Sequence, residues 1–287
     1  MATEISLVEL FDEIKRARER KKTPNLSKRS LRGADLRGAD LLGVNLSQSD
    51  LQDSDMREIN LQGANLKGIN LQNVKLADAR LQGANFEEAN LAGADLTGAN
   101  LQGANLEKAN LAGTQLANAN MQEVNLQKAL FDDTTLESVD LRRANFSGLD
   151  VRPLNLQTAQ LAGANFSGAN LSGMALDGFD LTAAVMQGAN LAGASLQDST
   201  LQNADLSKPQ SSSFLGGMFG SKPMPTNLTG VNLSRANLRE ANLAEADAAN
   251  AILSGADLSG AEMTGMILAG ANLSDATLAG AQLVNAD

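Results

Sequence analysis

The side chains that could do chemistry in this sequence are carboxylates, ammonium and guanidinium groups, hydroxyls and amides, because the chain contains no His and no Cys. Without an imidazole or a thiol there is no Ser-His-Asp or Cys-His nucleophile, no Cys/His metal site and no disulfide. The carboxylates and glycines recur with a fixed period, unlike the converging acid pairs of hydrolases or the glycines of a phosphate-binding loop. We therefore expect a protein that is not an enzyme and has no catalytic residues, no metal ligands and no cofactor.

The charge is unevenly distributed along the chain. The 287 residues carry a formal net charge of −10, yet residues 1–32 are basic, with nine Lys and Arg against five acids. An acidic body disfavours direct nucleic-acid binding, which depends on clustered cations that neutralise phosphates. No apolar run is long enough to span a membrane, and the N-terminus lacks the pattern of a signal peptide. The sequence thus predicts a cytoplasmic protein.

A period of five residues organises most of the chain. From Leu26 to Leu206 every fifth residue is Leu, Met, Phe or Val, and the pattern resumes at Leu228 and runs to Leu283 with Ala248 the only small residue. A small residue, most often Ala, precedes each central residue by two positions, Asn or Asp commonly precedes it by one, and Gly commonly follows by two. Neither a helix nor an ordinary strand can bury a period of five, so the chain must turn a corner in every repeat. Gly and Asn suit such corners because both tolerate unusual backbone angles.

These A-(N/D)-L-x-x repeats, such as Ala84-Asn85-Phe86 and Ala104-Asn105-Leu106, resemble the pentapeptide-repeat family. The resemblance implies an all-β fold, a right-handed quadrilateral β-helix with four repeats per coil, in which the central residue and the small residue point inward. It also points to a cyanobacterial source, because such proteins are plentiful there. It implies little about function, since members of the family differ in what they do.

Adding 20 to a residue number then gives its neighbour in the next coil. Asp132 is expected beside Arg152, Glu123 beside Arg143, and Glu88 beside Lys108, as exposed ion pairs. One face gathers more acids than bases, among them Asp35 and Asp55 with Arg37 and Arg57. Its excess of five negative charges is far below the density of duplex DNA.

The repeats are interrupted between Ser207 and Asn227, where 17 residues are inserted. Ser, Pro and Gly flank the insertion and predict a flexible loop that leaves one corner. Its middle holds an apolar cluster that we identify as a candidate protein-binding site: Phe214, Leu215, Met218 and Phe219. The alternatives are a loop that folds this cluster back over the junction and a loop without fixed structure.

Before the repeats, residues 4–22 predict one amphipathic α-helix. Ser6 and Glu9 have the spacing of a capping box, Leu7, Leu10, Phe11 and Ile14 share a face, and basic residues gather at the C-terminal end. Covering the first coil is the role we expect for this helix, and lying on an anionic membrane is the less favoured alternative. The predicted organisation is a capping helix at 1–23, a β-helix at 24–206, the inserted loop at 207–227 and a continuing β-helix at 228–287.

The function predicted from these features is that of a non-enzymatic scaffold or regulator, a rigid rod that binds an unidentified protein partner. One alternative is a DNA mimic that modulates a type II topoisomerase through the acidic face. Another is a membrane-peripheral assembly factor that uses the basic helix. The chain is expected to be a monomer or a weak homodimer formed through the C-terminal coil.

Overall fold

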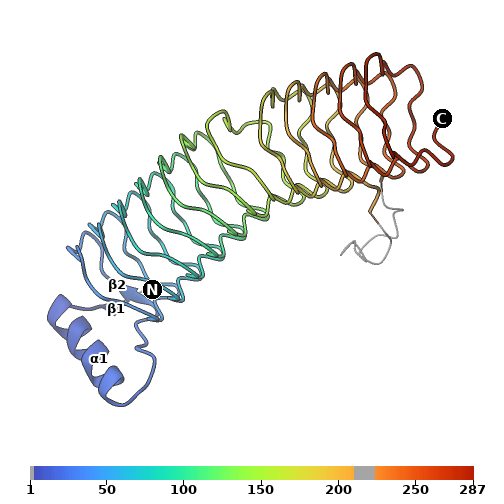
Figure 1. Cartoon of the computed structure of the whole chain (residues 1–287). Coiled ribbons are helices and arrows are strands. Elements are labelled where there is room, and N and C mark those ends of the chain that lie inside the picture. Colours follow the sequence, from blue (N-terminus) through green and yellow to red (C-terminus); the bar gives the residue numbers. More distant parts are fainter. Residues whose placement is uncertain (1–2, 210–223) are drawn as a thin grey trace. The chain divides into compact units, whose positions relative to one another are not determined.

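The computed structural model describes residues 3–209 and 224–287. They form two compact units, Met1–Ala144 with Pro153–Gln160 and Asn145–Arg152 with Leu161–Asp287. The one helix of the described residues is α1 (Leu7–Glu19), and the two named strands are β1 (Thr3–Glu4) and β2 (Arg29–Ser30), which pair in parallel (Figure 1). The repeats of both units are built from turns and isolated parallel bridges.

In each unit the bridges join residues 20 positions apart, except where they cross the insertion, so that four repeats make one coil. Examples are Asn85↔Asn105 in the first unit and Asn170↔Asn190 in the second. A corner after every central residue leaves only one bridged residue per repeat. The expected β structure is therefore present as single bridges, which are too short to count as continuous strands.

The repeat that begins at Leu101 shows how four of its five backbone N–H groups are paired within the backbone. Three donate to carbonyl groups of the adjacent coils, and the fourth closes a β-turn. The bonds are Leu101 to Asn120 (2.7 Å), Gly103 to Gln122 (2.8 Å), Asn105 to Ala84 (3.0 Å) and, within the turn, Ala104 to Leu101 (2.8 Å).

The turn requires a positive φ at its third residue, which is 65° at Gly103 and 59° at Lys108. A positive φ at that residue alone is the signature of a type II turn, in which Gly is favoured because it has no Cβ. Pro153 occupies this position in its repeat and cannot reach a positive φ. Within the described chain Asn155, the next outward residue, forms no bridge.

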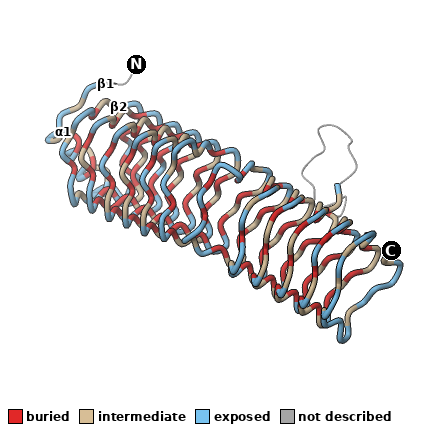
Figure 2. Tube along the Cα trace, turned by 90° about the horizontal axis from the view of Figure 1, so that it is seen from above, coloured by how far each residue is buried: buried red, intermediate tan, exposed pale blue. Residues whose placement is uncertain are grey.

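The central and the small residues fill the interior of each unit, and Figure 2 shows buried positions recurring along the coils. Leu101 is 0% exposed and Ala104 is 1% exposed. Where Ser or Thr replaces the small residue, its hydroxyl donates to a backbone carbonyl, as Thr114 does to Leu91 (3.0 Å). In the second unit the rings of Phe146 and Phe166 stack with their centroids 5.0 Å apart.

Helix α1 covers the start of the first unit. The predicted capping box is confirmed, since the Glu9 backbone N–H donates to Ser6 Oγ (3.2 Å) and the Ser6 backbone N–H donates to Glu9 Oε2 (3.0 Å). Leu10 and Ile14, one helical turn apart, are buried, whereas Phe11 is 43% exposed. Of the four apolar residues expected to share a face, Leu10 and Ile14 therefore pack on the first coil, whereas Phe11, about 100° around the helix from Leu10, is exposed.

The inserted segment leaves and rejoins the second unit at a corner. Bridges before it pair residues 20 apart, and bridges across it pair residues 37 apart, as in Asn190↔Asn227 and Asp205↔Asn242. After the insertion the spacing returns to 20, beginning with Asn227↔Asp247. The 17 additional residues therefore leave the register of the flanking coils unchanged.

The filled interior predicts the effect of removing one central side chain. Leu101→Ala should lower the free energy of unfolding by about 2–5 kcal/mol, because buried methyl groups are lost and a cavity remains. Gln102→Ala, at an exposed turn position of the same repeat, should change it by less than about 0.5 kcal/mol. Urea denaturation of the two variants measures the difference, and equal effects would contradict a closely packed interior.

Candidate functional site

The interior of each unit offers no space for a substrate. The central residues are almost completely buried throughout the described coils, except for half-buried Phe131 and for the last coil, where Leu268, Leu273, Leu278 and Leu283 are partly exposed. Among the described residues no group of three or more Asp and Glu side chains is placed to hold a metal ion. Any function that these residues perform must therefore be carried by the outer surface.

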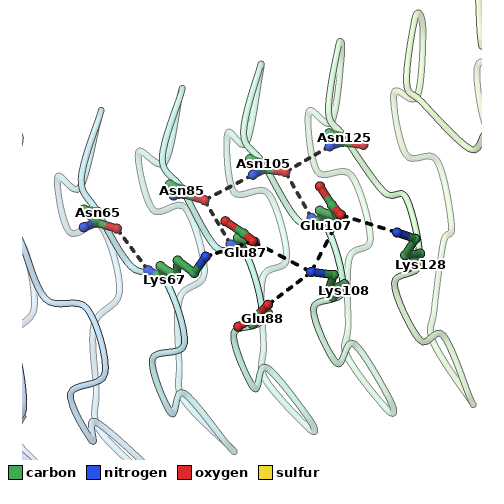
Figure 3. Close-up of polar contacts among 10 residues, drawn as sticks. All are labelled: Asn65, Lys67, Asn85, Glu87, Glu88, Asn105, Glu107, Lys108, Asn125 and Lys128. Atoms are coloured by element: carbon green, nitrogen blue, oxygen red, sulfur yellow. Dashed lines mark hydrogen bonds and ion pairs between the residues drawn. The ribbon is translucent and has the colours of Figure 1, made fainter. Parts of the chain in front are cut away.

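On one face of the first unit a row of asparagines runs from coil to coil (Figure 3). Asn105 Nδ2 donates to Asn85 Oδ1 (3.2 Å), and Asn125 Nδ2 donates to Asn105 Oδ1 (3.1 Å). The same Oδ1 atoms also accept a backbone N–H from the residue two positions later, as Asn85 does from Glu87 (3.0 Å). Each asparagine side chain thus accepts a backbone N–H of its own turn and also forms a hydrogen bond to the asparagine of the adjacent coil.

Beside this row lies a network of ion pairs, also drawn in Figure 3. Lys67 Nζ lies 2.9 Å from Glu87 Oε1, and Lys108 Nζ lies 3.2 Å from Glu88 Oε1, which confirms the predicted pair. Longer contacts join Lys108 to Glu87 and Glu107, and Lys128 to Glu107. The bond from Lys67 lowers the pKa of Glu87 and raises the pKa of Lys67. Because opposite charges alternate here, this face has little net field with which to attract a charged ligand.

The face expected to be acidic is partly neutralised as well. Arg37 donates through Nε and a terminal nitrogen to the two carboxylate oxygens of Asp35 (2.8 and 2.7 Å), and Arg57 does the same to Asp55 (2.9 and 2.7 Å). In the second unit Asp198 is bound by Arg235 at 2.6 and 2.7 Å. The predicted pair of Glu123 and Arg143 is also present, at 3.3 Å. The expected pair of Asp132 and Arg152 is not formed among the described residues, because Arg152 binds Asp150, two residues before it, at 2.5 Å. Many of the surface acids are therefore already engaged by cations of the chain.

The Asp35 carboxylate gives a direct test of this pairing. The hydrogen bonds from Arg37 lower its pKa to about 2, from an ordinary value of 3.8. The pair is therefore complete above pH 4 and is lost as the pH falls through 2. In Arg37→Gln the pKa of Asp35 should return toward 3.8, whereas in Arg57→Gln it should change much less. Carbon-detected NMR titration measures both, and an unchanged midpoint in Arg37→Gln would show that the pair does not form in solution.

The base of the insertion is anchored by one side chain that the sequence did not single out. Thr226 is 0% exposed, and its hydroxyl accepts the backbone N–H of Gly188 (2.9 Å). The same hydroxyl lies within hydrogen-bond distance of the carbonyl oxygens of Ser207 (3.0 Å) and Met186 (3.2 Å). On the other side of the insertion Lys208 pairs with Glu245 at 2.6 Å. Subtracting the 17 inserted residues places Thr226 at a small inward position, which is the signal in the sequence that could have identified it.

The residues predicted as the protein-binding site, Phe214, Leu215, Met218 and Phe219, lie outside the described residues. The structure locates only the residues on either side of this segment, Pro209 and Met224. These ends are close together, because a methyl group added at Gly188 would contact both the ring of Pro209 (2.9 Å) and the carbonyl oxygen of Met224 (3.3 Å).

The anchoring by Thr226 predicts a local effect. Thr226→Val removes the acceptor of the Gly188 N–H and should cost about 1–3 kcal/mol, because buried polar groups lose their partner. The exchange rate of the Gly188 amide, measured by hydrogen exchange, should rise accordingly. Thr229→Val, at a half-buried turn position, serves as the control. Equal protection of Gly188 in wild type and Thr226→Val would rule out the anchoring role.

Helix α1 is not long and apolar enough to cross a membrane, and the described residues contain no other helix. It is tied to the first coils by two ion pairs, Arg18 with Asp40 (3.2 Å) and Arg29 with Glu13 (3.1 Å).

Comparison with known sequences identifies the repeats. A family model described as pentapeptide repeats matches in eight copies, and a second model, described as a pentapeptide repeat region, matches residues 89–166. The first model covers residues 30–68, 69–107, 154–182, 176–208, 226–265 and 256–287. No curated protein matches the chain.

Several solved structures are similar to the chain. HetL, a pentapeptide repeat protein involved in heterocyst differentiation regulation from the cyanobacterium Nostoc sp. strain PCC 7120, is 28% identical, with 97% of each chain covered and a TM-score of 0.27. Rfr23 from the cyanobacterium Cyanothece 51142 is 30% identical over 44% of this chain and 97% of its own, with a TM-score of 0.23. QnrB1, a plasmid-mediated fluoroquinolone resistance protein, is 20% identical over 61% of this chain and 91% of its own, with a TM-score of 0.32.

Proposed function

The chain belongs to the pentapeptide-repeat family, whose members fold as right-handed β-helices, and from this premise we propose that it is a non-enzymatic scaffold that binds another protein. The proposal includes a right-handed quadrilateral form for the coils and a cytoplasmic location. Its main support is the closed interior, in which central side chains such as Leu101 and Leu233 are 0% exposed. A solenoid filled in this way can act on other molecules only through its outer faces, its ends and its insertions.

The insertion is the part of the surface that we assign to the partner. The faces described above consist of short side chains in hydrogen-bonded rows and of paired charges, which offer little apolar area to bury. The segment between Pro209 and Met224 instead carries Phe214, Leu215, Met218 and Phe219 in its sequence. Large apolar and aromatic side chains supply most of the binding energy in protein interfaces. The two ends of the segment, Pro209 and Met224, lie together beside Gly188 at one corner of the second unit, and this supports the assignment.

The two alternative functions have weaker support. A DNA mimic needs a dense field of negative charge, and Asp35, Asp55 and Asp198 are each bound by an arginine. A membrane-peripheral role needs a helix with one continuous apolar and basic surface, and α1 uses Leu10 and Ile14 to cover the first coil.

The test is a pull-down from lysate of the source organism, with replacement limited to residues 210–223 so that Pro209, Thr226 and the register of the coils are kept. A short Gly-Ser link can join the two ends, because both lie beside Gly188. The intact protein should retain a partner that the replaced protein loses, and the purified partner should then bind the intact protein alone. The loss should exceed about tenfold in affinity, as expected when several buried apolar side chains are removed.

Matched substitutions within the insertion provide the control. Phe214→Ser, Leu215→Ser, Met218→Ser and Phe219→Ser together should reproduce the loss. Ser211→Ala, Ser212→Ala and Ser213→Ala together should leave binding intact. A partner retained equally by all variants would remove the insertion from the proposal, and inhibition of gyrase supercoiling with no protein partner would favour the DNA mimic.

A further inference from the structure

The C-terminal end of α1 and the turn after it form a cluster of cations, which we call the basic end: Lys15, Arg16, Arg20, Lys21 and Lys22. We propose that the basic end binds an acidic segment of a partner protein. The inference rests on the proposed scaffold function and adds the chemistry of the partner and a second place of contact, on the first unit.

The cations of the basic end are not needed to complete the helix. The Lys21 N–H donates to the Arg18 carbonyl and the Lys22 N–H donates to the Ala17 carbonyl, both at 2.9 Å, and Lys21 has a φ of 53°. These bonds are those of a Schellman motif, which satisfies the last carbonyl groups with backbone donors. The side chains are therefore not required as hydrogen-bond caps and can bind another group.

Most of the basic end also lacks a partner within the fold. Among residues 3–209 and 224–287, Lys15, Arg20, Lys21 and Lys22 have no carboxylate within ion-pair distance. Arg16 has only an exposed contact of 3.7 Å with Asp12. Such a contact contributes little, so a carboxylate from outside can replace it. By contrast Arg18 and Arg29 are used to hold the helix on the coils.

A groove of about 270 Å³ at this end has the donors that an acidic side chain needs. Arg16, Arg20 and Lys22 line it together with Thr23 and Asn25. Glu13 also lines the groove, but its carboxylate accepts from Arg29 at 3.1 and 3.4 Å and is therefore already compensated. A carboxylate that enters the groove would meet the guanidinium groups of Arg16 and Arg20 and the ammonium group of Lys22. A guanidinium group can bind a carboxylate through two parallel hydrogen bonds.

The shape and charge of α1 favour a protein segment over a membrane as the occupant. Val8, 74% exposed, and Phe11 lie on the outer side of the helix, but the exposed carboxylates of Glu9 and Asp12 share its N-terminal half. A flat anionic membrane would meet these acids together with the basic end. An extended acidic chain can contact the basic end alone, and the acidic remainder of the protein would direct it there by repulsion elsewhere.

The experiment titrates a fluorescein-labelled oligoglutamate peptide with the full-length protein and follows the anisotropy of the label. The triple variant Arg20→Gln, Lys21→Gln and Lys22→Gln should bind the peptide about tenfold more weakly, as expected from the loss of three exposed charge contacts. The control is Lys75→Gln, Lys128→Gln and Arg143→Gln, which removes the same charge elsewhere on the first unit. The control should stay within about twofold of wild type, and added salt should weaken the binding of wild type.

Four results would overturn the inference. The first is that wild type does not bind oligoglutamate at low salt, and the second is that both triple variants weaken binding equally. The third is tighter binding of inorganic phosphate than of the peptide, which would indicate a site for a small anion. The fourth is binding to vesicles of phosphatidylserine and phosphatidylcholine that the Arg20, Lys21 and Lys22 substitutions abolish, without binding of the peptide. Circular dichroism and thermal melts establish that each variant is folded.

The protein with residues 210–223 replaced separates this inference from the proposed function. It should bind oligoglutamate as wild type does, because the basic end is unchanged. Peptide binding without any partner in the pull-down would contradict the role of the insertion and leave the basic end supported. A partner that depends on the insertion in the pull-down, without any peptide binding, would support the role of the insertion and contradict that of the basic end.

Discussion

One backbone N–H in each regular repeat has no backbone carbonyl as its partner, neither in the adjacent coils nor in its own turn, and the surface side chains must supply an acceptor for it. In the repeat at Leu101 it is the N–H of Gln102, which donates to the side-chain Oδ1 of Asn100 at 3.1 Å. A turn N–H that is left unpaired costs free energy, and an Asn or Asp two residues earlier is well placed to accept it. The preference for Asn or Asp before the central residue follows from this requirement.

The same requirement limits what the faces of each unit can present. Asn can accept from its own turn and donate to the adjacent coil, as Asn105 does, but Asp can only accept. Stacked aspartates such as Asp35 and Asp55 therefore place like charges one coil apart. Arg37 and Arg57 compensate these charges from the position directly after the central residue. Charge is therefore confined to the turn residues and to the outward position before the central residue, since the central and the small residues fill the interior.

Much of this arrangement could be predicted from the sequence because each repeat makes the same local choice. The period of five identified the inward positions, and the addition of 20 correctly paired Glu88 with Lys108 and Glu123 with Arg143. It was wrong for Arg152, which binds Asp150 of its own coil and not Asp132 of the preceding one. The role of Asn was only partly predicted, because Asn was expected at corners for its tolerance of unusual backbone angles. In the structure its side-chain oxygen accepts a backbone N–H of the turn, and the positive φ belongs to the residue two positions after the central one. The function of Asn depends on which backbone N–H groups find no acceptor in the neighbouring coils, and the sequence of a single repeat does not show this.

Other features depended on packing that has no period. The orientation of Phe11 is set by how α1 rests on the first coil. The anchoring by Thr226 is set by where the chain rejoins the second unit after the insertion. The predicted binding residues Phe214, Leu215, Met218 and Phe219 lie outside the described structure, so their role remains a prediction. The basic end of α1 was visible in the sequence as charge, but its groove and its lack of partners required the fold.

The position of the insertion also bears on how such a chain can change in evolution. Its two ends meet at one corner, beside Gly188, and the coils on either side keep their register. The entropy lost on closing a loop between fixed ends grows only with the logarithm of its length, so that doubling the length costs about 0.6 kcal/mol. Length and sequence at this corner are therefore almost independent of the stability of the coils. New recognition segments can be acquired or exchanged there while the repeats remain under a separate constraint, that of pairing with one another.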